Sequence, residues 1–191
     1  MYLLIADLTG LLHNQNNVAT EASPITTLLE NEVGKDLCRM LGYDPTHAWG
    51  HITCGGSVAN LESIWAARNL KFYPLSLKLA IEASSLSYLA DVFEVELCTG
   101  KKKKFVQCDT WELLNLKPST VLNIPDQLFN DFGVSQTALT NAFSPFSIQT
   151  VGKDYLEKQF NIKSSPQMFV GTTKHYSWPK GAGRSIEPIY F

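Results

Sequence analysis

A glycine-rich turn that leads into a helix is the part of this sequence best suited to chemistry. Its residues, CGGSVAN, run from Cys54 to Asn60. A helix N-terminus offers backbone N–H groups without intrahelical partners and the positive end of the helix dipole, and both favour a phosphate. Gly55 and Gly56 have no side chain to block a close approach, and the Ser57 hydroxyl is expected to donate a hydrogen bond while capping the helix. The turn therefore predicts a phosphate-binding site.

The spacing of these residues leaves a second interpretation open, a plain turn with an N-capping serine. The segment has no G-K-[ST] element of a Walker loop, and it does not match the G-x-G-x-x-G turn of dinucleotide-binding proteins. These two common nucleotide sites are therefore excluded at this position.

A histidine among aromatic residues is the second candidate. The segment KHYSWPK, from Lys174 to Lys180, directly follows the apolar run PQMFVG, where α/β proteins place ligand sites. His175 at this place is suited to lie flat on an aromatic cofactor ring. The alternative is a histidine with a structural role, and Lys180 by itself is typical of a surface lysine.

A metal site competes for some of the same residues. His47, His51 and Cys54 have the spacing H-x3-H-x2-C, which suits zinc ligands. A fourth ligand is not apparent, and Cys54 belongs to the phosphate turn. We therefore expect no metal site here.

Two helices are expected to position these groups. Ser23 as N-cap, Pro24 at the first helical position and Gly42 past the end delimit a helix in SPITTLLENEVGKDLCRMLG. Its apolar residues recur at helical spacing: Ile25, Leu28, Leu29, Val33, Leu37 and Leu41. The polar segment HNQNNVATEA before it is expected to be a loop. After the glycine turn, VANLESIWAARNLKFYPL resumes helical periodicity.

The middle of the chain changes in character. We expect a further helix from Pro74 to about Leu89, then strands in FEVEL and FVQC joined by a hairpin whose solvated tip carries Lys101 to Lys104. Residues 109–165 are expected to be an insertion-like helical region. PQMFVG predicts a short buried strand, TTKHYSWPKGA predicts a loop and a helix start, and the ending GRSIEPIYF matches neither pattern.

The composition restricts the class of protein. With 191 residues, 45% hydrophobic and 18% charged, the chain can bury a core, and its net charge of -2 gives no reason to expect nucleic acid or a membrane as partner. The start MYLLIADLTGLL lacks the basic region and cleavage site of a signal peptide and is too short to span a bilayer. The four cysteines form no C-x-x-C pair, which favours reduced thiols and a cytoplasmic location.

Taken together and in this order, three blocks resemble the group II pyridoxal-phosphate (PLP) dependent decarboxylases, the family of glutamate, aromatic-amino-acid and tyrosine decarboxylases. NNVATEASPITTLLENEVGKDLCRMLGY is similar to the family's loop and helix with S-P-x-x-x-x-x-E. GHITCGGSVANLESIWAARN is similar to G-x-x-T-S-G-G-T-E-A-N-L-x-x-L-x-x-A-R, and HYSWPKGA to H-x-S-x-x-K-A. The DTWELLNL insertion is similar to that of the bacterial-type tyrosine decarboxylases in particular.

The resemblance implies a fold and a set of roles. The fold would be α/β, part of the large PLP domain of the aspartate-aminotransferase type, with a mainly parallel sheet, flanking helices and a homodimer that forms sites at its interface. The cofactor would contact Gly55, Gly56, Ser57, Asn60 and His175, with His175 stacked on the pyridine ring as the catalytic residue. Asn16, Asn17 and Val18 would face a small amino-acid substrate, tyrosine, another aromatic amino acid or glutamate.

The resemblance also shows departures. Val58 replaces the usual Glu, and Cys54 replaces Ser or Thr. The lysine that forms the aldimine with PLP and the acidic partner of the pyridine nitrogen have no counterpart, because both lie in the family well beyond the H-x-S-x-x-K block. Lys180 is not a substitute for that lysine.

These departures suggest an amino-terminal fragment of a carboxy-lyase. Its expected parts are an arm over 1–23, an incomplete PLP-binding domain over 24–182 and a tail over 183–191 that does not match the family. We expect such a chain to be inactive alone. Two alternatives stay open: a non-catalytic piece that pairs with a full-length decarboxylase through Ser23 to Leu41, and a chain that does not fold stably.

Overall fold

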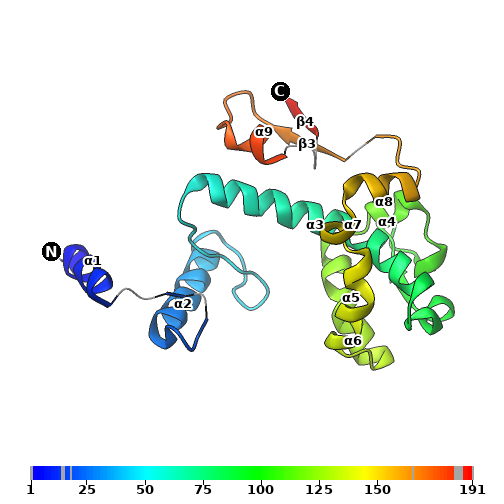
Figure 1. Ribbon diagram of the computed structural model, residues 1–191, viewed down its shortest axis with the longest axis horizontal. Helices are drawn as coiled ribbons and strands as arrows, with labels where there is room; N and C mark the ends of the chain where they lie inside the picture. Colours follow the sequence, from blue (N-terminus) through cyan, green and yellow to red (C-terminus); the bar gives the residue numbers. More distant parts are fainter. Residues whose placement is uncertain (1, 14–15, 18, 165, 183–186, 191) are drawn as a thin grey trace. The chain divides into compact units, whose positions relative to one another are not determined.

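The computed structural model describes residues 2–13, 16–17, 19–164, 166–182 and 187–190, and it divides the chain into two compact units, 1–59 and 60–191. Figure 1 shows the helices and strands of both units. Among the described residues, no helix combines the length and apolar character needed to cross a membrane.

The helices are α1 Tyr2–His13, α2 Pro24–Met40, α3 Gly56–Ala83, α4 Thr110–Leu114, α5 Pro118–Phe132, α6 Gln136–Phe143, α7 Ile148–Val151, α8 Lys153–Gln159 and α9 Ser177–Ala182. Short 3-10 turns are η1 Ser87–Asp91, η2 Phe105–Gln107 and η3 Ser144–Phe146, and the strands are β1 Glu94–Glu96, β2 Lys102–Lys104, β3 Gln167–Val170 and β4 Glu187–Tyr190.

Helix α2 begins and ends as its sequence predicts. Ser23 is the N-cap, Pro24 is at the first turn, and Gly42 follows the helix with φ of 79°. Its buried residues are the small Gly34 and Cys38. Gly34 packs closely against the backbone, because a Cβ added to it would lie 2.3 Å from the carbonyl oxygen of Gly50. Most of the apolar residues that predicted the helix are exposed, namely Ile25, Leu28, Leu29, Val33 and Leu41, and Leu37 is half-buried.

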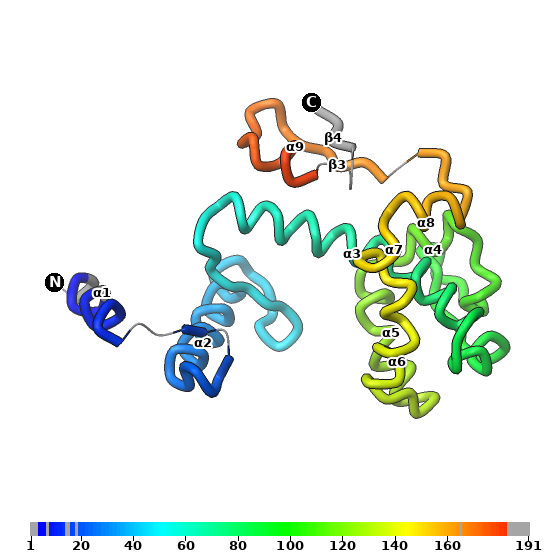
Figure 2. Tube along the Cα trace, in the orientation of Figure 1, coloured from blue at the N-terminus to red at the C-terminus, as the bar shows by residue number. Residues whose placement is uncertain are grey.

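Helix α3 corrects the expected break at Pro74. One helix of 28 residues runs from Gly56 to Ala83, so the two predicted helices are continuous (Figure 2). An interior proline loses a backbone hydrogen bond and costs about 3 kcal/mol or more. Phe72, Leu75 and Ile81 flank it and are at most 1% exposed, and burying each contributes about 1.5–3 kcal/mol. Burial of this stretch therefore offsets the cost of the proline.

The hairpin is present, but its second strand lies elsewhere than expected. β1 pairs with β2 antiparallel, with Glu94 opposite Lys104 and Glu96 opposite Lys102. The lysine run therefore forms a strand rather than a hairpin tip, because opposite charges face each other across the pair. The turn lies earlier, where Gly100 has φ of 82°, and FVQC forms the turn η2 instead of a strand.

The core of the second unit lies among the carboxyl half of α3, the hairpin and the helices of 109–165, which confirms the expected helical region (Figure 1). Phe93, Phe105, Ile124, Leu128 and Leu156 are all fully buried there. Each helix contributes an apolar stripe, so these short elements share one core.

The strands of the second unit differ from the expected mainly parallel sheet. Among the described residues there are two separate two-stranded sheets, β1 with β2 and β3 with β4. β3 is the strand that PQMFVG predicts, although its Phe169 is 68% exposed rather than buried. β4, in the ending that matched no pattern, pairs with β3 in parallel, with Gln167 opposite Glu187. Among the described residues, a parallel ladder occurs only in this pair.

Candidate functional site

The glycine turn opens α3 as predicted, with one correction to the cap. α3 begins at Gly56, and the Gly55 carbonyl accepts hydrogen bonds from the backbone N–H groups of Val58 at 3.0 Å and Ala59 at 3.2 Å. Gly55 is therefore the N-cap, and Ser57 lies inside the first turn. The Thr53 hydroxyl also donates to the Gly55 carbonyl at 2.9 Å, which fixes the peptide that enters the helix.

The space around the two glycines is open. A Cβ added to Gly55 or to Gly56 would meet no atom within 4 Å. The N–H groups of Gly56 and Ser57 precede the first hydrogen bond of α3, and a helix of 28 residues directs the positive end of its dipole toward them. Ser57 is half-buried in this first turn. The turn can thus receive an anion against its backbone.

A hydrogen-bonded chain of side chains joins α3 to the first residue of α9 and to His175 before it. The Asn60 amide Nδ2 donates to Ser177 Oγ at 2.8 Å, although the two residues are 117 positions apart. Ser177 Oγ lies 2.9 Å from His175 Nδ1, and the Ser177 backbone N–H donates to the same nitrogen at 3.3 Å. Ser177 is 4% exposed, whereas His175 is exposed. Two of the predicted residues, Asn60 and His175, are therefore linked through a third.

The backbone N–H of Ser177 decides the tautomer of the histidine. Nδ1 of His175 accepts from that N–H, so the ring proton is assigned to Nε2. The Ser177 hydroxyl then donates to Nδ1 and accepts from Asn60, so the hydroxyl and the backbone N–H of Ser177 share the one lone pair of Nδ1. The result is an exposed imidazole that is held by one nitrogen and offers an N–H donor at the other.

Ser177 is the residue that the sequence analysis missed as part of a site. It is the serine in the H-x-S spacing of HYSWPKGA, so the signal was present in the motif. Tyr176, between the two, lies with its ring centroid 4.2 Å from that of His175 at an interplanar angle of 41°. It is 65% exposed, so an aromatic surface extends beside the imidazole. Lys180 is exposed in α9.

The residues expected to face a substrate are placed in part. Asn17 Nδ2 donates to Glu30 Oε2 at 3.0 Å, and Asn17 Oδ1 accepts from the Thr26 hydroxyl, so this amide is tied to α2. Asn16 is exposed, and Val18 lies outside the described residues. Contact of this loop with a substrate stays a prediction.

The histidine and cysteine candidates for zinc do not gather. No group of three or more His, Cys, Asp or Glu side chains that would suit a metal ion occurs in the part of the chain that the structure describes. Cys54 is an exposed free thiol on the turn, and Cys38, Cys98 and Cys108 are also free.

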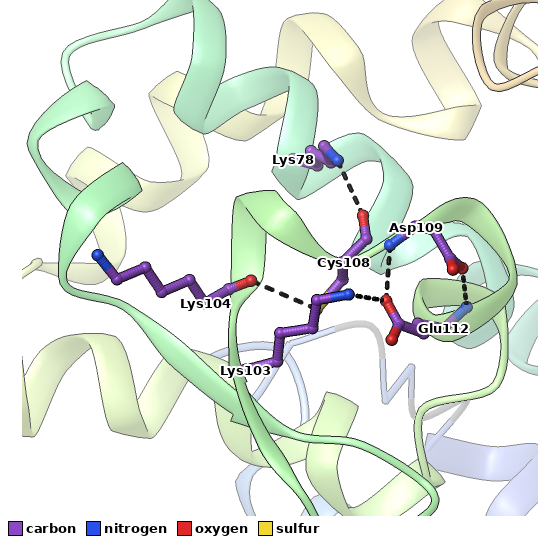
Figure 3. Close-up of polar contacts among 6 residues, drawn as sticks. All are labelled: Lys78, Lys103, Lys104, Cys108, Asp109 and Glu112. Atoms are coloured by element: carbon purple, nitrogen blue, oxygen red, sulfur yellow. Dashed lines mark hydrogen bonds and ion pairs between the residues drawn. The ribbon is translucent and has the colours of Figure 1, made fainter.

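A second polar cluster lies in the second unit and has a structural role (Figure 3). Asp109 and Glu112 form a capping box at the start of α4, and Lys103 Nζ lies 2.7 Å from Glu112 Oε2, joining β2 to that helix. The hydrogen bond from Lys103 holds the pKa of Glu112 below its usual value, and the same bond raises the pKa of Lys103. Burial raises the pKa of Cys108 to about 11, so this thiol is not a nucleophile at neutral pH.

Comparison with known proteins confirms the resemblance that the motifs indicate. The chain is 35% identical over 182 residues to a protein of Levilactobacillus brevis named L-tyrosine decarboxylase, which is 95% of this chain and 23% of the relative. Proteins of the same name from Enterococcus faecalis and Enterococcus faecium are 32% identical, each over 94% of this chain and 23% of the relative. No protein-family model matches the chain.

The alignment covers very different shares of this chain and of its relatives. Nearly all of this chain aligns, yet it spans only 23% of the length of the relatives. The similarity therefore supports a decarboxylase relationship for the chain as a whole.

Proposed function

We propose that this chain supplies the phosphate-binding turn and the ring-stacking histidine of a PLP-dependent amino-acid carboxy-lyase of the tyrosine decarboxylase type. The observation that carries the proposal is the Asn60–Ser177–His175 chain of hydrogen bonds, which presents an exposed imidazole in a set orientation. The names of the relatives support the reaction class. The segment 24–182 is proposed to be part of the large PLP domain, with β3 as its share of the sheet.

The turn at the start of α3 fits the phosphate of such a cofactor. The two glycines leave room for its oxygens, and the backbone N–H groups of Gly56 and Ser57 can donate to them. The Ser57 hydroxyl adds a donor from the same turn. Gly55, Gly56 and Ser57 are the residues that would hold the phosphate.

His175 fits the aromatic ring of the cofactor. Its imidazole is exposed, so one face is free to stack on a planar heterocycle. The hydrogen bonds to Nδ1 limit rotation of the ring, which lowers the entropy lost on stacking. Asn60 acts through Ser177, so we assign both as positioning residues.

The bound cofactor would supply an electron sink for loss of the α-carboxylate as carbon dioxide. The share of this chain is binding and orientation: α3 holds the phosphate, and His175 aligns the ring. We propose that the chain alone is inactive, because no lysine and no acidic residue in it match the family's covalent anchor and its partner for the ring nitrogen. Homodimerisation and the use of tyrosine, another aromatic amino acid or glutamate as substrate are part of the same proposal.

Titration with PLP and with pyridoxal tests the phosphate turn. PLP is expected to bind more tightly than pyridoxal, and Ser57→Ala or Gly56→Val is expected to narrow that difference. Ser119→Ala is the matched control, because Ser119 is also the second residue of its helix and is exposed. Equal affinities of PLP and pyridoxal in the unmodified chain would refute the phosphate assignment.

His175→Ala tests the stacking residue. The variant is expected to weaken PLP and pyridoxal to the same extent, because the ring and not the phosphate is affected. Carbon dioxide release from tyrosine, DOPA or glutamate is expected to stay at the level of PLP in buffer. Release above that level by the purified chain would contradict the proposed inactivity.

A second candidate function is a non-catalytic piece that pairs with a full-length decarboxylase. The exposed apolar residues of α2 favour it, since Ile25, Leu28 and Leu29 are 67%, 63% and 59% exposed. Co-purification with such an enzyme, lost in Leu28→Glu, is expected under this proposal. A chain that stays monomeric in the presence of the enzyme would refute it.

A further inference from the structure

A pocket of about 520 Å³ lies in the second unit, between residues 63–72 of α3 and the strand β3. Its α3 side begins at Ser63 and ends at Phe72, and its other side carries Met168, Phe169 and Trp178. This volume is in the range of pockets that hold small organic molecules. Most of its lining residues are apolar, namely Ile64, Ala67, Phe72, Pro166, Met168, Phe169 and Trp178.

Two cations from neighbouring turns of α3 line this apolar pocket. Arg68 and Lys71 are three residues apart, so they share one face of the helix. Among the residues that the structure describes, no Asp or Glu lines the pocket. Among the described residues neither cation forms an ion pair, and Arg68 hydrogen-bonds to the neutral amide oxygen of Asn69 at 3.1 and 3.3 Å.

The charges restrict what can occupy the pocket. Burial lowers the pKa of Lys71, in keeping with an ammonium that the protein partly covers. A purely apolar occupant would desolvate both cations further, at a cost in free energy. An acidic group would offset that cost, and the planar fork of Arg68 is suited to two oxygens of one acid.

We propose that this pocket binds a small organic anion, with its carboxylate or sulfonate between Arg68 and Lys71 and its aromatic body against Phe169 and Trp178. Phe169 is 68% exposed without a ligand, so an aromatic ring has accessible surface to cover. The proposal does not depend on the phosphate turn, because none of its residues belongs to Cys54–Asn60.

Titration of the 191-residue chain with 2-naphthoate and with its neutral analogue 2-naphthamide tests the proposal. Arg68→Gln combined with Lys71→Gln is expected to lower the affinity for naphthoate about tenfold or more, because charge-assisted hydrogen bonds are lost. The affinity for naphthamide is expected to change less than twofold. Lys101→Gln combined with Lys158→Gln is the matched control, since it removes the same charge from exposed residues outside the pocket.

Phe169→Ala provides a second test that does not alter the charge. It is expected to weaken both ligands, and because Phe169 is largely exposed the fold should be retained, as circular dichroism would show. PLP binding is expected to be unchanged in the Arg68 and Lys71 variant, which separates this pocket from the proposed phosphate turn.

Three results would overturn the proposal. The first is no saturable naphthoate binding at millimolar concentration, and the second is an equal loss of affinity in the two double variants. The third is a dimer whose dissociation follows substitution of Arg68 and Lys71, because a second copy of the chain would then be the occupant.

Discussion

Removal of the Ser177 hydroxyl is the perturbation that tests the site most directly. In Ser177→Ala, Asn60 loses its acceptor at 2.8 Å and His175 Nδ1 keeps only the longer bond from the backbone at 3.3 Å. A neutral hydrogen bond contributes about 0.5–1.5 kcal/mol, and two are removed from a residue that is 4% exposed. Since Asn60 and His175 can regain water in part, we expect the local structure of 175–182 to lose about 1–2 kcal/mol.

Hydrogen exchange followed by mass spectrometry is the assay for this change. A loss of 1–2 kcal/mol corresponds to exchange in peptides of 175–182 that is faster by a factor of roughly 5–30, provided that the helix reopens locally. Ser164→Ala is the control, because Ser164 is an exposed serine that precedes β3 in the same unit. The core peptides of α5 are expected to exchange as in the unmodified chain.

A double-mutant cycle isolates the bond between the two side chains. Asn60→Ala, Ser177→Ala and the double variant are expected to give a coupling of about 1 kcal/mol, while effects of Asn60 on helix propensity cancel in the cycle. A coupling near zero, or exchange in Ser177→Ala equal to that in Ser164→Ala, would refute the assignment of a hydrogen-bonded chain that orients His175.

Three further predictions concern packing and charge. Gly34→Ala is expected to destabilise the first unit by about 1–2 kcal/mol, because its Cβ would lie 2.3 Å from a backbone oxygen. Hydrogen exchange in peptides of residues 30–50 measures this loss. Gly10→Ala should instead stabilise α1, because its Cβ would meet no atom within 4 Å. Because the pKa of Glu112 is lowered in the fold, its carboxylate stabilises the folded chain at pH values above its usual pKa of 4.5, and this stabilisation is lost as pH falls through the lowered pKa. Glu112→Gln should therefore make the free energy of unfolding decline less steeply as the pH is lowered. Because burial raises the pKa of Cys108 to about 11, iodoacetamide at neutral pH should alkylate exposed Cys54 and spare Cys108, as peptide mass spectrometry would show.

Local sequence signals determined much of the outline. Ser23, Pro24 and Gly42 bound α2 because capping depends on neighbouring residues alone. The two glycines before Ser57 likewise indicated the start of α3, and the order of the three motif blocks indicated the decarboxylase relationship that the relatives confirm. Such features are readable because their causes lie within a few residues of chain.

Tertiary structure decided what depends on distant partners. Pro74 lies inside a continuous helix because its neighbours are buried in a core that the sequence pattern does not reveal. Lys102 to Lys104 form a strand because they pair with Glu94 to Glu96 across the hairpin. Ser177 became part of the candidate site because Asn60, 117 positions away, donates to it. The sequence determines which groups can cap, turn or bind, and only the folded chain determines which of them meet, because contacts between distant residues depend on the packing of every element between them.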